Sequence, residues 1–279
     1  MVVQHNMQAA NANRMLGANV KAVAKNTEKL SSGYKVNRAA DDAAGLSISE
    51  KMRNQIRGIN QAVKNAEDGQ YLIQTAEGNL NEIHSILQRM GELANKAAND
   101  VNQSVDRTAI KDELKQLTSE IDSISKKAQF NGTYLLNGDM SVASAKYLQV
   151  GANHGENMKI SISKISASTL SIRFMSSGGD LSVSTHSLAS QALSIVTDAI
   201  QDVSKLRSKL GAIQNRLDYT INNLNNYSEN LTSAESNIRD TDMATEMVNY
   251  SKNNILQQAA QSMLAHANQS NQGVLSLLG

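Results

Sequence analysis

The chain has 279 residues with 27 basic and 26 acidic side chains, so it lacks the basic excess of a protein that binds nucleic acid. It contains no Cys, which excludes disulfides and thiolate chemistry, and no Pro, the residue that most often breaks helices. With two Phe, seven Tyr and no Trp, burial depends on aliphatic side chains and Met, a composition that favours packed helices.

The N-terminal segment predicts a short helix followed by a linker. Apolar side chains recur on one helix face in steps of four and three: Leu16, Val20, Val23, Leu30. The pattern ends in the polar stretch 31–45, where Asp41 and Asp42 suit the start of the next helix. The first ten residues do not resemble a cleavable signal, and no run of 18 apolar residues follows, so we expect no membrane contact.

Two further helices are predicted after this linker. Heptad spacing resumes at Met52 and continues to Ala94, which indicates one helix of roughly 45 residues. The spacing tightens beside Gly69 and Gly78, where such a helix would be weakest. After a polar turn at 99–106, a third apolar seam leads to Ala128, so a helical hairpin is expected.

The pattern changes between about residues 130 and 187. Asn-Gly turns and alternation of apolar and polar residues predict a small β-hairpin region, with 159–163 as the best strand and 147–150 and 171–174 as weaker ones. Helical spacing then returns from Leu193 to Ile238. The last segment, from about Asp242, is rich in Met, Ala and Gln.

The order of these segments is symmetric: a short arm, a linker and a long helix at the front mirror a long helix, a linker and a short arm at the back. We therefore expect the two terminal arms to pair with each other. Two paired helices leave much of their combined apolar stripe exposed, so other copies of the chain should complete the burial. Repeated contacts that do not close on themselves give a helical filament.

Two long motifs at opposite ends of the chain resemble those of the bacterial flagellins. The front motif is Lys29–Leu46, KLSSGYKVNRAADDAAGL, and the back motif is Ala234–Glu246, AESNIRDTDMATE. ILQQA at 255–259 and VLSLL at 274–278 also agree. The resemblance covers about residues 1–135 and 187–279, and both long motifs occur in the family's order.

This resemblance implies a mainly α fold of long antiparallel helices with a small β-hairpin region. It implies a discontinuous inner domain of two terminal helices, spoke linkers and a rod domain: 1–33 with 241–279, 34–45 with 232–240, and 46–231 with its β-hairpin region at about 130–187. The large outer domains of many flagellins are inserted between the two matched parts. Here that interval is nearly empty, so we expect a short form without them.

The resemblance also implies the partners and the location. Flagellins polymerise with copies of themselves, meet hook-associated junction and cap proteins, and leave the cell through the flagellar export apparatus to form the extracellular flagellum. A chaperone holds their C-terminal arm during export. Met243, Met247 and Met263 therefore have two interpretations: an adaptable surface that binds the chaperone, or residues that fill the core, and the second is favoured. The residues expected to carry polymerisation are Leu16, Val20, Val23, Leu30, Met243, Met247, Ile255, Leu256, Leu275 and Leu278.

A receptor contact is a further implication. Flagellins present a Gln-Arg-x-Arg-Glu-Leu segment to the flagellin-sensing Toll-like receptor of animals, and residues 88–93 resemble that segment except that Gly91 replaces its second Arg. The candidate contact residues are Gln88, Arg89, Glu92, Leu93 and Glu113. The missing cation predicts weaker signalling. An equally weighted alternative is that Leu93 and its neighbours serve packing between protofilaments.

No enzyme site is expected. None of the five histidines belongs to a His-Glu-x-x-His pattern, and Asp41 and Asp42 lack a partner base. The glycines at 178 and 179 do not form a phosphate loop, so catalytic, cofactor and metal residues are all predicted to be absent. The rival functions are a hook–filament junction protein, a secreted adhesin or immune ligand that acts as a monomer, and, more remotely, an enzyme inserted in the middle.

Overall fold

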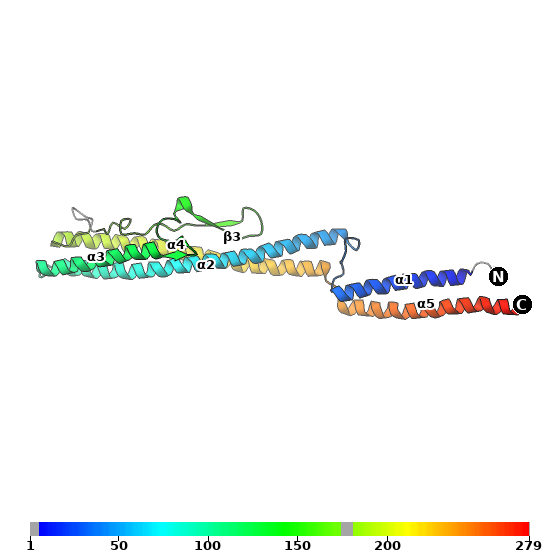
Figure 1. Cartoon of the computed structure of the whole chain (residues 1–279). Helices are drawn as coiled ribbons and strands as arrows, with labels where there is room; N and C mark the ends of the chain where they lie inside the picture. Colours follow the sequence, from blue (N-terminus) through cyan, green and yellow to red (C-terminus); the bar gives the residue numbers. More distant parts are fainter. Residues whose placement is uncertain (1–5, 174–180, 279) are drawn as a thin grey trace. The chain divides into compact units, whose positions relative to one another are not determined.

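The computed structural model describes residues 6–173 and 181–278, with the side chains of the last helix described as far as Ser270. Five helices account for most of the chain: α1 Met7–Ser32, α2 Ala43–Ala97, α3 Ser104–Lys127, α4 His186–Arg239 and α5 Met243–Leu278 (Figure 1). Short elements lie between α3 and α4: β1 Gln129–Phe130, β2 Thr133–Tyr134, the 3-10 helix η1 Val142–Ser144, β3 Lys146–Gln149 and β4 Asn157–Ile160. The predicted mainly α fold with a small β-hairpin region is confirmed.

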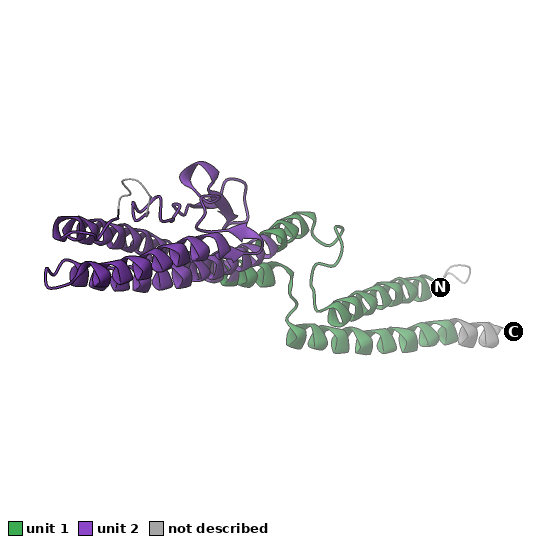
Figure 2. Ribbon diagram, turned by 60° about the vertical axis from the view of Figure 1, so that its left-hand side comes forward, with its two compact units in different colours: residues 1–55, 229–279 green, residues 56–228 purple. Residues whose placement is uncertain are grey.

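The chain forms two compact units (Figure 2). The first unit combines Met1–Gln55 with Glu229–Gly279, and the second is Ile56–Ser228. The helices α2 and α4 each contribute residues to both units. Within the described residues, no helix is both long and apolar enough to cross a membrane.

The second unit has an aliphatic core between α2, α3 and α4. Most heptad positions predicted for α2 are buried, including Ile73, Leu80, Ile83, Leu87 and Met90, and the others are half-buried; α2 also buries residues outside that pattern, such as Leu93. The facing helices add Leu114 and Ile121 from α3 and Val196, Val203 and Leu210 from α4. Neither Gly69 nor Gly78 interrupts α2, because the buried residues on both sides of them hold its 55 residues in one helix.

Two small antiparallel hairpins occupy the segment between α3 and α4. The first pairs β1 with β2 around Asn131 and Gly132, whose φ angles of 46° and 75° suit a tight hairpin turn. The second pairs β3 with β4, with Leu148 opposite Met158. The predicted strand 159–163 is paired only as far as Ile160. Beyond it the alternation of buried and exposed residues continues without a strand, since the amide of Ile162 donates to the carbonyl of Met140 at 2.7 Å.

Other sequence predictions need correction. Residues 171–173 do not form a strand, and Phe174 lies outside the described residues. The helix α2 begins at Ala43, within the segment predicted as a linker, and α4 continues to Arg239, so the predicted linker 232–240 is helical almost to its end. Only Asp240–Asp242 separate α4 from α5. The side chains of these linker segments make specific contacts that a polar sequence does not reveal.

The second hairpin packs closely against α2, and two of the points of contact on α2 are glycines. A Cβ added at Gly58 would lie 2.9 Å from the Cβ and 3.2 Å from the Cα of Ala152 in the loop between β3 and β4. A Cβ at Gly69 would collide with Leu148 of β3. Between these glycines, the side-chain amide of Asn65 donates to the carbonyl of Gln149 at 3.0 Å. The hairpin therefore depends on glycine at two turns of the helix face beneath it.

Candidate assembly surface

The two terminal helices, α1 and α5, lie side by side in the first unit (Figure 1), as the symmetry of the sequence predicts. They are antiparallel, because the start of α1 meets the later part of α5 and the end of α1 meets the start of α5. The Asn6 side-chain amide donates to the carbonyl of Ala267 at 3.0 Å, and the Lys29 ammonium lies 3.7 Å from the Glu246 carboxylate. The Asn6 side-chain oxygen also caps α1 by accepting from Ala9.

The most deeply buried side chains between these two helices are polar. Among the described side chains of α1 and α5, only Asn26 and Glu246 are buried, each at 8% exposure. The half-buried positions around them include Asn19, Asn253 and Gln257. Of the described residues of the whole first unit, Val36 is the one large apolar side chain that is buried. This unit therefore has almost no hydrophobic core of its own.

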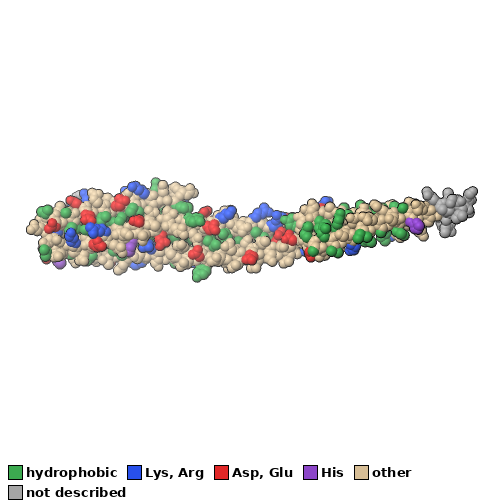
Figure 3. All heavy atoms as spheres, turned by 90° about the horizontal axis from the view of Figure 1, so that it is seen from below, with side chains coloured by type: hydrophobic (Ala, Val, Ile, Leu, Met, Phe, Trp, Pro, Cys, Tyr) green, Lys and Arg blue, Asp and Glu red, His purple; other side chains and the backbone are tan. Residues whose placement is uncertain are grey.

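Most of the large apolar side chains of the pair lie on its outside. Ile255 is 66% exposed, and Met7 is 74% exposed. The exposed large apolar residues of the two helices are Met7, Met15, Val20, Met243, Met247, Val248, Ile255, Leu256 and Met263. Hydrophobic side chains lie along the face of this unit that Figure 3 displays. An ordinary pair of amphipathic helices buries its apolar stripe between the helices. Here the most deeply buried side chains are polar, and most of the large apolar side chains are exposed.

The ten residues predicted to carry polymerisation fall into three groups. Leu16, Val23 and Leu30 are half-buried against the partner helix. Val20, Met243, Met247, Ile255 and Leu256 are exposed. Leu275 and Leu278 lie where side chains are outside the described residues. Next to the exposed group, an open trough runs between the helices and is lined by Ala12, Met15, Ala260, Met263 and Ala267, with polar residues at its edges.

The front and back sequence motifs meet where residues 33–35, after α1, lie beside residues 239–241, between α4 and α5; we call this place the crossing. Tyr34 and Asp240 form an antiparallel bridge. On either side of it, the amide of Lys35 donates to the carbonyl of Arg239 at 2.8 Å and the amide of Thr241 donates to the carbonyl of Gly33 at 2.9 Å. Gly33 ends α1 in the left-handed conformation, with φ 76°. The motifs, far apart in sequence, therefore form one local structure.

Arg239 connects three segments at this crossing. Its guanidinium donates to the Glu50 carboxylate at 2.8 Å and to the Ser49 hydroxyl at 3.4 Å, both in α2. It also lies over the ring of Tyr34, 4.7 Å from the centroid. The Ser49 hydroxyl in turn donates to the Glu235 carboxylate at 3.0 Å. The end of α4 is thus joined to the start of α2 and to the linker.

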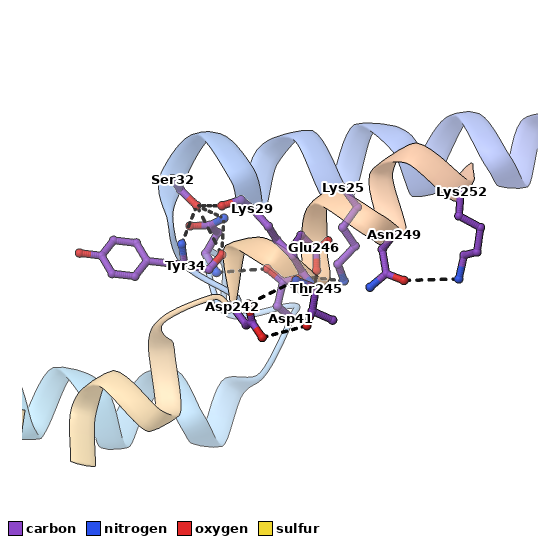
Figure 4. A network of polar contacts seen from close by, with 11 residues as sticks. Lys25, Lys29, Ser32, Tyr34, Asp41, Asp242, Thr245, Glu246, Asn249 and Lys252 are labelled. Carbon is purple, nitrogen blue, oxygen red and sulfur yellow. Dashed lines mark hydrogen bonds and ion pairs between the residues drawn. The ribbon is translucent and has the colours of Figure 1, made fainter. Parts of the chain in front are cut away.

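Carboxylates organise the segments around the crossing (Figure 4). Asp41 lies 2.9 Å from the Lys25 ammonium and accepts from two linker amides, and these hydrogen bonds, the one from Lys25 above all, lower the pKa of Asp41. The same contact raises the pKa of Lys25. Asp42, rather than Asp41, accepts from the first turn of α2, at 2.9 Å from the amide of Gly45. At α5, Asp242 caps the helix, and hydrogen bonds from Thr245 lower its pKa.

The predicted receptor residues lie on the second unit. The Arg89 guanidinium is 3.0 Å from Glu113 of α3 and 3.1 Å from Glu92, and the hydrogen bond with Glu113 is the main cause that raises the pKa of Arg89. These three side chains and Gln88 are exposed, and Gln88 contacts His84 at 3.2 Å. Leu93 differs, since only 3% of it is exposed and it belongs to the core. The structure thus gives Leu93 a packing role within its own unit.

Sequence reasoning did not single out Asn26, Arg239 or Glu246. The signal for Asn26 was its place one heptad after Asn19 on the helix face that pairs. Glu246 is the only acidic residue of α5, so its isolation was visible. No such signal marked Arg239, whose partners are brought to it by the chain crossing. In the described part of the chain, no group of three or more His, Asp or Glu side chains could hold a metal ion.

The chain is similar to flagellins over its whole length. A family model of the bacterial flagellin N-terminal helical region matches residues 3–141, and one of the bacterial flagellin C-terminal helical region matches residues 193–278. A flagellin from Halalkalibacterium halodurans is 49% identical over 278 residues, with 100% of both chains covered. One from Bacillus subtilis is 48% identical over 303 residues, again with 100% of both covered. The crystal structure of Bacillus cereus flagellin, 29% identical, aligns with 58% of this chain and 88% of its own at a TM-score of 0.49.

Proposed function

Because the chain belongs to the bacterial flagellin family and is a subunit of the flagellar filament, we propose that the apolar side chains outside the α1–α5 pair form its polymerisation surface. The observation that carries this proposal is the inverted packing of the pair, with Asn26 and Glu246 inside and residues such as Ile255 outside. The subunit serves motility as a structural element and has no enzymatic activity.

The energetics support this role. Burying one side chain the size of Val, Leu, Ile or Met stabilises by about 1.5–3 kcal/mol. Association costs about 4–15 kcal/mol, so burial of several of the exposed arm residues by neighbouring copies is enough to offset it. A contact that joins different faces of successive subunits and does not close produces a helical filament.

Seeded growth tests the proposal. Purified subunits are added to filament fragments, and the concentration of free subunits at which growth stops is measured. Replacing both Met247 and Ile255 by Ser should raise this critical concentration at least tenfold, since about 1.4 kcal/mol corresponds to a factor of ten. Val142→Ser removes a side chain of η1 that is 68% exposed, and it serves as the control with a much smaller effect.

The same experiment distinguishes a filament subunit from the main alternative, a hook–filament junction protein. A hook–filament junction protein caps or joins filaments but does not extend them. If wild-type subunits never elongate seeds, even at high concentration, the bulk-subunit function fails and the junction function is favoured. A monomeric secreted adhesin would likewise leave the seeds unextended and would not bind their ends.

We further propose that the exposed face of α5 is held by an export chaperone before the subunit leaves through the flagellar export apparatus. Met243, Met247 and Met263 are about half exposed or more in the free subunit, and soft thioether side chains suit an interface that must later be buried elsewhere. The hook-associated junction and cap proteins would meet the same surface on the terminal subunits. Replacing the three Met residues by Ser should weaken chaperone binding to the isolated segment 241–279, as measured by calorimetry.

A second candidate function is contact with the flagellin-sensing Toll-like receptor. The exposed cluster of Arg89, Glu92 and Glu113 favours it, because the guanidinium and both carboxylates are held together on one surface of the second unit. Gln88 completes this surface. Leu93 is buried and would act by supporting the helix rather than by touching the receptor. Soluble receptor ectodomain and the purified subunit provide a direct binding measurement.

A further inference from the structure

We propose that Asn26, Lys29 and Glu246 fix the register in which α1 pairs with α5. A single register holds the exposed apolar residues of the two helices in one fixed arrangement relative to each other. This inference rests on the polymerisation surface proposed above and adds to it the residues that align that surface. Figure 4 shows Lys29 of α1 and Glu246 of α5 directed toward each other across the pair.

Apolar packing cannot select the register of this pair. The half-buried apolar residues of α1, Leu16, Val23 and Leu30, recur every seven residues, as do Ala260 and Ala267 on α5. A shift of one heptad therefore sets one aliphatic residue of α1 in the place of another and one alanine of α5 in the place of another. Most of the other large apolar side chains of the pair are exposed. Another feature must therefore distinguish the observed alignment from a shifted one.

The buried asparagine is one such feature. The Asn26 side chain is 8% exposed, and its amide nitrogen is buried without a hydrogen-bond partner among the described residues. A single Asn in a helical seam lowers stability but selects one alignment, because shifted alignments bury it against different groups. Asn26 stands one heptad after Asn19 on the face that meets α5.

The ion pair is the second feature. Glu246 is the only acidic residue in α5, its side chain is 11% exposed, and the Lys29 ammonium lies 3.7 Å from it. A shift of one heptad would replace Lys29 by Ala22 opposite this carboxylate. Lys25, the next cation along, is already bound to Asp41 at 2.9 Å. A buried carboxylate that loses its partner is strongly destabilising, so this alignment is preferred.

Disulfide trapping tests the register directly, because the chain has no Cys of its own. Asn6→Cys with Ala267→Cys reports the observed register, in which these residues touch. Asn6→Cys with Ala260→Cys reports a shift of one heptad. Each pair is introduced into the wild-type chain and into Asn26→Leu/Glu246→Leu. Links are quantified by mass spectrometry, both in free subunits and in variants co-assembled with excess wild-type subunits.

In the wild-type background we expect the 6–267 link alone, and in the Leu variant we expect both links in comparable amounts. Exchanging the charges, Lys29→Glu with Glu246→Lys, should restore the single 6–267 link, whereas either substitution alone should give both links. The control Asn13→Leu/Gln258→Leu changes exposed residues of the same helices and should give only the 6–267 link.

Three outcomes would overturn the inference: the Leu variant retains only the 6–267 link, the charge exchange leaves both links, or the control also acquires the 6–260 link. None of them depends on whether filaments grow. Failure of wild-type subunits to elongate seeds would instead count against the polymerisation surface, so the two proposals can fail separately.

Discussion

The guanidinium of Arg239 lies 4.7 Å from the centroid of the Tyr34 ring, which places the last residue of α4 over the linker that follows α1. Beside this contact, the backbone bridge between Tyr34 and Asp240 holds the two passages of the chain together. The first unit has almost no hydrophobic core, so its folded structure depends more on these polar contacts than on buried apolar side chains.

Arg239→Ala should therefore destabilise the first unit. It removes a cation–π contact and the ion pair with Glu50, together about 1–2 kcal/mol. A loss of this size is a factor of roughly five to thirty in an equilibrium constant, and we expect the critical concentration for seeded growth to rise by that factor. Arg216→Ala, at an exposed position of the same helix, is the matched control. An unchanged critical concentration for Arg239→Ala would show that the crossing does not need it.

Acid should loosen the linker through Asp41. The folded-state pKa of Asp41 is lowered from 3.8 by hydrogen bonds from Lys25 and linker amides. The stability that this carboxylate contributes is therefore present above its unfolded pKa and is lost as the pH falls through the lower folded value. Protease cleavage within residues 33–42 should accelerate below about pH 4. Asp41→Asn should be cleaved faster at neutral pH and should depend less on acid; an acid response equal to that of wild type would contradict this.

Two glycines of α2 should respond oppositely to the same substitution. Gly78→Ala places its Cβ in open space and should stabilise the chain by about 0.5–1 kcal/mol through helix propensity. Gly58→Ala gains the same propensity but puts its Cβ 2.9 Å from the Cβ of Ala152, and displacing that loop should cost about 1–3 kcal/mol. Chemical denaturation of the second unit measures both. A stabilising Gly58→Ala would mean that the hairpin does not need this close approach.

The core of the second unit is easier to predict from the sequence than the packing of the first, for a physical reason. In the second unit the heptad residues of α2, such as Leu80 and Leu87, are buried by neighbours within the same chain, so their pattern predicts the core. In α5 the pattern is less informative: Met247, expected among the polymerisation residues and also weighed as a core residue, is 51% exposed, whereas Glu246 looks like a surface residue and is buried. We propose that other copies of the chain cover these apolar residues, and periodicity alone cannot place such contacts.

The linkers were misjudged because their polar composition hides tertiary contacts. The resemblance implied a spoke linker at 232–240, but the helical spacing that continues to Ile238 is the better guide, since α4 runs to Arg239. Glu235 and Arg239 bind Ser49 and Glu50 of α2. Helix propensity is a weak guide where such contacts exist. For the receptor segment, the sequence correctly grouped Arg89 with Glu113, but it did not reveal that Leu93 is buried.

Gly91→Arg should increase activation of the Toll-like receptor in a reporter assay. It restores the second cation of the segment beside Arg89, and its Cβ fits at 3.8 Å from Val196. The substitution also gains up to about 1 kcal/mol of helix propensity, so stability must be controlled for. Gly78→Arg makes the same change on the same helix at a position with open space. Equal dose responses for Gly91→Arg and wild type would contradict the proposal that Arg89 and its neighbours contact the receptor.

Deleting either arm should abolish filaments while leaving the second unit folded. Residues 1–40 and 241–279 contribute nothing to the described core of that unit, which is built from α2, α3, α4 and the hairpins. Each arm, by contrast, loses the helix it packs against when the other is removed, and the exposed apolar residues that the deleted arm carries are lost with it. Electron microscopy of seeded samples should find no growth by either truncated chain, and circular dichroism should retain a cooperative unfolding transition. Filaments from either truncated chain would refute the role of the paired arms, and loss of the transition would refute the independence of the second unit.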